Sequence, residues 1–181
     1  RAQRTVASAA GKMDAIDEKM MRLAIKEALK SLESGDVPVG CIITDAEGKI
    51  VARARNAREK NSDATAHAEI LAIKKAGKKT GRWNLTGCTM FVTLEPCAMC
   101  AGAAVNARIK RIVYGAQDLR FGCCGTVFDI TRSEKLNHRC EVTGGVLREE
   151  CLEPLQNFFK TLRMSKNNGG KPKSLDKKLL K

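Results

Sequence analysis

Apolar and polar residues alternate along the chain with the spacings of helices and strands. From Asp14 to Leu32 the apolar positions recur every three or four residues, which is typical of an amphipathic helix, and Gly35 follows as a helix-ending residue. The runs PVGCIITDA (38–46) and KIVARAR (49–55) flank a turn and predict a β-hairpin. The same patterns predict the remaining elements: a helix over 66–76 that Gly77 ends, a strand over 90–94, a helix from Pro96 to Asn106, strands over 111–116 and 140–146, and a helix over 149–164 that Pro154 kinks or restarts.

The order of these elements predicts the fold class. Helices alternate with strands after an initial hairpin, which favours an α/β layered domain with helices covering a mixed sheet. A length of 181 residues with 43% hydrophobic content suits one packed domain, which we place at 14–164. Residues 1–13 are expected to be a flexible leader or cloning remnant, and 165–181 a basic, flexible tail.

Apolar run length and charge restrict the function classes. The longest apolar stretch, Cys97–Val105, is too short to cross a membrane, for which about 18 residues are needed, so no membrane partner is expected. The formal net charge is +13, of which residues 1–12 carry +3 and residues 160–181 carry +7. Two interpretations stay open: a nearly neutral domain with solvated basic tails, or tails that help to bind a polyanion such as nucleic acid.

Eight cysteines raise the question of disulfides. Secreted disulfide scaffolds are usually much shorter and follow an apolar signal region, and no apolar run opens this chain. We therefore expect reduced thiols. The expected compartment is the bacterial cytoplasm, with a plastid stroma as the alternative if residues 1–12 are a transit remnant.

Two short segments, TAHAEI (65–70) and LEPCAMC (94–100), carry candidate metal ligands. Taken alone, the histidine is typical of a hydrogen-bonded or surface residue. The Cys-x-x-Cys pair, taken alone, is typical of a redox pair, of half a structural zinc site or of two buried thiols. Each segment opens a predicted helix, and cysteines three residues apart face the same way on a helix. His67, Cys97 and Cys100 therefore predict a Zn²⁺ site with one open position, which is the arrangement of a catalytic zinc.

Glu69 adds a group that a catalytic zinc can use. Residues two apart diverge by about 200° on a helix, so His67 and Glu69 meet one site only at the exposed helix end. A carboxylate beside zinc-bound water takes its proton and passes it on, and zinc lowers the pKa of that water toward ~7. The vicinal pair Cys123-Cys124 remains an alternative source of a fourth ligand, which would close a structural site.

The spacing H-x-E followed by P-C-x-x-C resembles the signature of zinc nucleobase deaminases. The resemblance covers roughly residues 14–165, where segments fall in the order seen in the TadA family of bacterial-type tRNA-specific adenosine deaminases: PVGCII, DATAHAEI, NLTG, MFVTLEPCAMCAGAAVNARIKRIVYGA, CCGTVFDI, LNHRCEVTGGV and NFFKTLR. It implies the cytidine deaminase-like fold, a three-layer α/β/α arrangement with a mixed five-stranded sheet.

The resemblance also implies an activity, the hydrolytic deamination of adenosine to inosine at the wobble position (34) of a tRNA anticodon. Zinc-bound hydroxide would attack C6 of adenine while Glu69 protonates N1 and then the departing amine. The ligand roles fall on His67, Cys97 and Cys100. The implied partners are the tRNA anticodon stem-loop and a second copy of the chain, in a homodimer.

Four further positions resemble RNA contacts of the family, and each has a structural alternative. Asn56 matches the base pocket, or is an asparagine that ends a strand. Asp118 contacts RNA or caps a turn. Phe159 contacts RNA or is a core residue of the last helix, and Arg163 contacts RNA or is a solvated charge.

Arg108, Lys110 and Arg111, with the lysine-rich tail, are candidates for phosphate contacts.

Two other functions remain open. A deaminase of free guanine, cytosine or a pterin-like molecule would use the same zinc and the same Glu69, but it gains little from basic tails. A zinc-stabilised RNA-binding module, or the inactive subunit of a heterodimeric deaminase, is disfavoured by the presence of Glu69.

Overall fold

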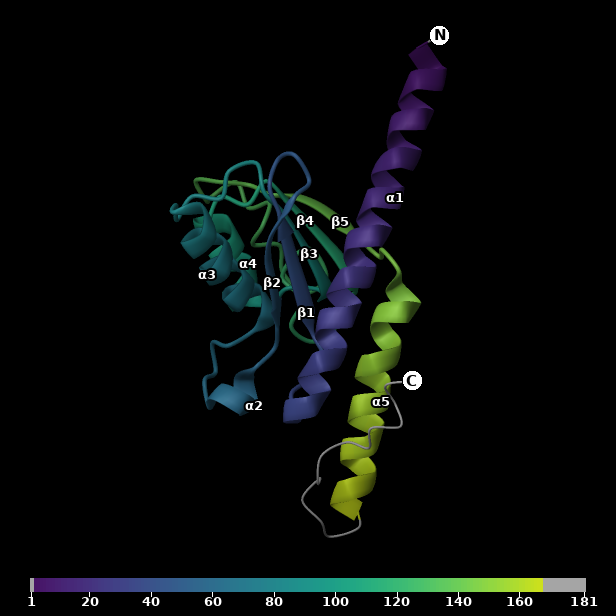
Figure 1. Cartoon of the computed structure of the whole chain (residues 1–181), viewed down its shortest axis with the longest axis vertical. Coiled ribbons are helices and arrows are strands. Elements are labelled where there is room, and N and C mark those ends of the chain that lie inside the picture. The colour runs from purple at the N-terminus through teal and green to yellow at the C-terminus, as the bar shows by residue number, and fades with distance from the viewer. Residues whose placement is uncertain (1, 168–181) are drawn as a thin grey trace.

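The computed structural model describes the backbone of residues 2–167 and the side chains of residues 15–165 (Figure 1). Its elements in chain order are α1 (Ala2–Leu29), the 3-10 helix η1 (Lys30–Ser34), β1 (Gly40–Thr44), β2 (Ile50–Arg55), α2 (Arg58–Asn61), α3 (Ala68–Thr80), β3 (Thr89–Leu94), α4 (Ala98–Asn106), β4 (Arg111–Ala116), β5 (Glu141–Gly144) and α5 (Arg148–Asn167). No helix in this described part of the chain combines the length and apolar composition needed to cross a membrane.

Five strands form one mixed sheet in the order β2-β1-β3-β4-β5. β1 pairs antiparallel with β2 and with β3, whereas β3, β4 and β5 run parallel. α1 and α5 pack on one face of the sheet, and α3 and α4 cover the other (Figure 1). The three-layer α/β/α fold and the mixed five-stranded sheet predicted from the sequence are confirmed.

Alternation along the central strands divides the core between the two faces. On β3, Met90 and Val92 pack toward α3 and α4, while Phe91 packs toward α1 and α5. All three are buried, because helices cover both faces of the sheet. This two-sided burial explains why MFVTL is a continuous apolar run at its start rather than an alternating one.

Two helix boundaries differ from the prediction. α1 begins at Ala2, so the segment 2–13, expected to be a flexible leader, has helical backbone continuous with the predicted helix. α3 continues past Gly77 to Thr80, and the left-handed residue that ends it is Gly81, with φ 67°. Many helices end with a residue in this conformation just beyond the last turn, and glycine adopts it without strain.

The helices after β3 and β5 also shift. α4 begins at Ala98 rather than at Pro96, because Cys97 has extended backbone as the N-cap residue. α5 runs from Arg148 to Asn167 without a restart at Pro154. Its side chains at i, i+4 and i+7, Cys151, Leu155 and Phe158, are buried, so tertiary packing holds the helix across the proline. The predicted tail lies outside the described residues from 168 onward.

A buried ion pair joins α1 to the sheet. The Arg111 guanidinium donates to both carboxylate oxygens of Asp17, at 2.9 and 2.6 Å, and to the Thr143 hydroxyl at 2.9 Å. Asp17 is buried, so neither charge faces solvent freely. Three of the five guanidinium N–H donors of Arg111 are used within the fold, which argues against the predicted phosphate contact.

The close approach of α1 to β1 requires glycine at position 40. A Cβ there would overlap the Ala24 carbonyl oxygen and lie 2.5 Å from the Ala28 amide nitrogen, and these are backbone atoms that cannot rotate away. We expect Gly40→Ala to lower the free energy of unfolding by roughly 1–3 kcal/mol, measured by urea denaturation. Gly102→Ala in α4 is the control, because its Cβ would enter open space and alanine favours a helix. Equal stabilities of the two variants would contradict the prediction.

Candidate functional site

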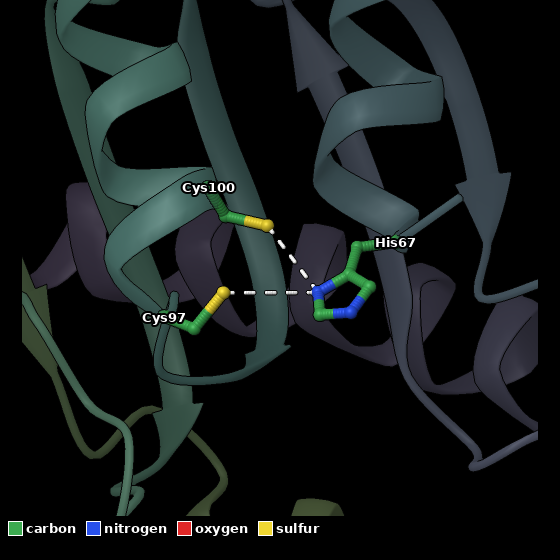
Figure 2. A group of neighbouring side chains, drawn as sticks. All are labelled: His67, Cys97 and Cys100. Atoms are coloured by element: carbon green, nitrogen blue, oxygen red, sulfur yellow. Dashed lines mark hydrogen bonds between the residues drawn. The ribbon is translucent and has the colours of Figure 1, made fainter. Parts of the chain in front are cut away.

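Two helices begin beside one another at the candidate site. His67 is the N-cap residue of α3, and Cys97 is the N-cap residue of α4, both with extended backbone. Neither side chain forms a capping hydrogen bond, so both remain available as ligands. Cys100 lies in the first turn of α4, and the three side chains point toward one another between the helix starts (Figure 2).

The spacing of the three ligand atoms fits a tetrahedral zinc ion. The His67 Nδ1 atom lies 3.8 Å from the Cys97 Sγ atom and 3.5 Å from the Cys100 Sγ atom. Zn–S and Zn–N bonds of about 2.3 and 2.0 Å at a tetrahedral angle place nitrogen and sulfur about 3.5 Å apart. Among the residues that the structure describes, these three are the one group of histidine, cysteine or acidic side chains that lie close enough together to hold a metal ion.

The protein groups alone already favour a thiolate at this place. Hydrogen bonds from the Cys100 thiol and from His67 lower the pKa of Cys97 to about 4. The same contacts raise the pKa of Cys100, which keeps its proton, and raise the pKa of His67. Both helix N-termini add partial positive charge, and thiolate is the form of cysteine that binds metal.

Glu69 is the second residue of α3 and lines the same cavity as His67. Its side chain is only 4% exposed, and burial raises the pKa of its carboxyl group. The predicted geometry is confirmed here, because His67 precedes the helix and Glu69 follows within its first turn. Glu69 is not part of the ligand group, so its carboxyl group can exchange protons.

His67, Glu69 and Cys97 line a cavity of about 320 Å³. Its wall comes from the segment before β1, the ends of β2 and β3, the starts of α2, α3 and α4, and the loop after β4: Val37, Val39, Asn56, Arg58, His67, Ala68, Glu69, Leu94, Glu95, Cys97, Asp118 and Phe121. Apolar walls with a few polar groups suit a flat aromatic base.

Two of the four predicted RNA contacts lie in this cavity. Asn56 is buried, its side-chain nitrogen donates to the Val37 carbonyl at 3.1 Å, and its side-chain oxygen accepts from the Arg58 backbone at 3.4 Å. Asp118 accepts hydrogen bonds from the backbone N–H groups of Arg120 and Phe121, so it also caps the turn that follows. Both residues therefore combine a place in the cavity with a structural contact.

The other two predicted RNA contacts lie on α5 and do not line the cavity. Phe159 is 44% exposed, so it is not a core residue, and its ring meets Phe158 edge to face at a centroid distance of 5.4 Å. Arg163 is exposed. Of the basic candidates, Lys110 is exposed, whereas Arg108 donates to the Asn137 side chain at 2.7 Å.

The alternative fourth ligands are not in the ligand group. Cys123 and Cys124 are both buried, and burial raises the pKa of each thiol. The Cys123 thiol instead donates to the Phe121 carbonyl at 3.3 Å. The described residues thus leave the three-ligand arrangement without a closing thiol.

Sequence reasoning missed Glu95, which organises the loop over the cavity. This carboxylate is 2% exposed and accepts three backbone N–H groups: Cys124 and Thr126 on Oε1, at 3.0 and 3.1 Å, and Asp118 on Oε2, at 3.2 Å. A Cβ at Gly122 would overlap the same carboxylate. The available signal was its position directly before Pro96 and Cys97, where a charged residue ends a buried strand.

Arg58 and Phe121 are further cavity residues that the sequence did not single out. Arg58 opens α2, and its guanidinium pairs only with the exposed Glu59 among the described residues. The fully buried Asp36 fixes α2, because its carboxylate accepts the backbone N–H groups of Glu59 and Lys60, at 2.6 and 3.3 Å. No spacing in the sequence links these distant partners.

Comparison with known families identifies the class. Residues 14–116 match the model of the cytidine and deoxycytidylate deaminase zinc-binding region. The chain therefore belongs to this family of zinc-dependent deaminases and is an enzyme that acts on a carbon–nitrogen bond. The prediction of zinc as the cofactor is confirmed.

Within this family, the chain is similar to proteins named tRNA-specific adenosine deaminase. It is 49% identical over 150 residues to the one from Bacillus subtilis, covering 83% of this chain and 92% of that protein. It is 43% identical over 165 residues to the one from Haemophilus influenzae, covering 91% of each. The family resemblance seen in the sequence is thus confirmed.

Solved structures agree on the fold. One, from a study of A-to-I editing by tRNA:A34 deaminases at the wobble position of transfer RNA, superposes with a TM-score of 0.73 at 37% identity, over 76% of this chain and 99% of that one. A guanine deaminase from Nitrosomonas europaea superposes with a TM-score of 0.68 at 21% identity, over 78% and 83%. The second similarity concerns the fold alone.

The role of Glu95 is tested by removing its acceptors. Glu95→Ala leaves the buried N–H of Cys124 and the partly buried N–H groups of Thr126 and Asp118 without this acceptor. A buried N–H left unpaired costs roughly 1–3 kcal/mol, so we expect lower stability and faster hydrogen exchange at Cys124 and Thr126. Glu95→Gln is the matched control, because one amide oxygen can still accept those two bonds. Unchanged exchange in Glu95→Ala would show that the loop is held by other contacts.

Proposed function

We propose that this protein deaminates adenosine to inosine at the wobble position of a tRNA anticodon. The observation that carries the proposal is that His67, Cys97 and Cys100 form a group able to hold a metal ion, beside a cavity that His67 and Cys97 line together with Glu69. The choice of substrate is supported by the relatives at 43–49% identity that are named tRNA-specific adenosine deaminase.

His67, Cys97 and Cys100 are the proposed zinc ligands. Three protein ligands leave one tetrahedral position open, as in catalytic rather than structural sites. Zinc bound there supplies Lewis acidity, which makes water nucleophilic at neutral pH. His67 and Cys97 lie directly before α3 and α4, and Cys100 lies in the first turn of α4. The helix starts therefore fix the imidazole and the two thiols, and zinc binding requires little reorganisation of the backbone.

Glu69 is the proposed proton carrier. Its carboxylate takes one proton from the attacking water and delivers it to N1 of adenine as the C6–O bond forms. It then takes the second proton from the oxygen now bonded to C6 and delivers it to the amine, which leaves as ammonia when the C6–N bond breaks. Its burial excludes competing water from the carboxyl group. Because Glu69 is not one of the proposed zinc ligands, its carboxylate is free to move between these atoms.

Asn56 is the proposed base-reading group. One side-chain N–H of Asn56 donates to the Val37 carbonyl, and one lone pair of its side-chain oxygen accepts from the Arg58 backbone N–H. The other N–H and the other lone pair remain for the edge of the base. Asp118 in the cavity wall, and Phe159 and Arg163 outside the cavity, are proposed to contact the anticodon loop. A target nucleotide must leave the base stack to reach such a site.

A homodimer and a cytoplasmic location complete the proposal. Five large apolar side chains are exposed in α4 and in the loop after β4: Met99, Leu119, Phe121, Val127 and Phe128. A second copy of the chain would cover these side chains. All eight cysteines are free thiols, which suits a reducing compartment.

The ligand assignment is tested with single cysteine variants. We expect Cys97→Ser and Cys100→Ser to lose bound zinc and to unfold at lower urea concentration, because metal binding is coupled to folding. Cys123→Ser is the control and is expected to keep its zinc. Metal content is measured by atomic absorption after gel filtration, and full occupancy in either of the first two variants would refute the assignment.

The activity is tested by mass-resolved product analysis with an anticodon stem-loop that contains adenosine, beside free adenosine, cytidine and guanine. We expect inosine at the wobble position and no change in the free compounds. Glu69→Ala is expected to keep zinc and to lose turnover by at least about 10²-fold, while the exposed Glu47→Ala stays active. Deamination of a free compound with no reaction on the RNA would replace the proposal with a small-molecule deaminase.

A further inference from the structure

A cationic surface lies on α3, away from the cavity. We define the α3 basic face as six exposed residues of α3, the loop that follows it and the edge strand β2: Arg53, Lys74, Lys75, Lys78, Lys79 and Arg82. No aspartate or glutamate occurs between Ile70 and Leu94. In the part of the chain that the structure describes, none of the six side chains forms an ion pair.

A structural role accounts for only two of these lysines. The Lys75 ammonium donates to the Arg53 carbonyl at 2.9 Å, and the Lys79 ammonium donates to the Ile50 carbonyl at 3.2 Å. These bonds cover the open edge of β2, which would otherwise expose unpaired carbonyls. Lys74 and Lys78 hydrogen-bond to no residue in 15–165, and like charges at i and i+4 destabilise a helix.

An aromatic side chain stands beside these cations. Trp83 follows Arg82 directly, is 70% exposed, and is the one tryptophan of the chain. Exposed tryptophan next to unpaired lysines is typical of surfaces that bind nucleic acid, where bases stack on the ring and cations contact phosphates. An acidic protein segment would use the charges but would not require the ring.

We propose that the α3 basic face and Trp83 bind the backbone of the tRNA substrate outside its anticodon loop. α3 begins at the cavity, just after His67, and Lys74 to Lys79 lie roughly 10–18 Å farther along its axis at about 1.5 Å per residue (Figure 1). One helix thus links the site of the target base to a phosphate-binding surface. This inference rests on the proposed function for the identity of the RNA.

Trp83 provides a direct readout, because its fluorescence is the only tryptophan signal of the protein. Full-length tRNA lacking modifications is titrated into the zinc-loaded protein, and we expect it to quench Trp83. In Lys74→Gln/Lys78→Gln the slope of log affinity against log salt should fall by about 2, since two phosphate contacts are lost. The charge-matched control Lys19→Gln/Lys26→Gln alters exposed lysines of α1, in the opposite layer, and should keep the slope.

Each other outcome overturns the inference in a distinct way. The face does not contact the RNA if two results are found together: saturating tRNA does not change Trp83 fluorescence, and the double variant has the same salt slope as the protein without substitutions. If poly-glutamate quenches Trp83 at lower concentration than tRNA, the partner is an acidic protein. Deamination of the anticodon stem-loop is measured separately, so quenching by tRNA without deamination would refute the proposed function and leave the RNA-binding face standing.

Discussion

The meeting of two helix N-termini at one point is the constraint on which the rest of the site depends. α3 and α4 pack side by side on one face of the sheet, and their first residues, His67 and Cys97, have the extended backbone of N-caps. Because neither caps its own helix, both side chains are left to face each other. The positive ends of the two helices then favour the thiolate, so the fold itself prepares a set of ligands for a metal cation.

Two buried carboxylates that line the same cavity have different surroundings, which suit them to different roles. Glu95 is held by three backbone N–H groups from the loop after β4, which satisfies its charge and fixes that loop over the site. Glu69 lies at the start of α3, where burial favours its protonated form. A carboxylate with saturated hydrogen bonds is a structural anchor, whereas one with spare valences can carry a proton.

Features set by local patterns could be predicted from the sequence, whereas features set by distant pairs could not. The strands and the grouping of His67, Cys97 and Cys100 follow from periodicity and short spacings. The partners of Arg111 and Glu95 lie 94 and 23 to 31 residues away, and no local signal connects them. Arg111 therefore looked like a phosphate contact, although Asp17 binds it in the interior. The end of α3 was misplaced for a related reason: two glycines satisfy the pattern, and only the backbone shows that Gly81 is left-handed.

The fold does not determine the substrate, because a guanine deaminase shares it at 21% identity. Substrate choice must then come from what surrounds the common site. A free base needs only the cavity, and it gains nothing from unpaired cations more than 10 Å away along α3. Such cations repel one another and persist at a cost in stability unless a polyanion meets them. The arrangement of charge outside the cavity, on the same helix that begins at His67, therefore favours a substrate much larger than the base that is deaminated.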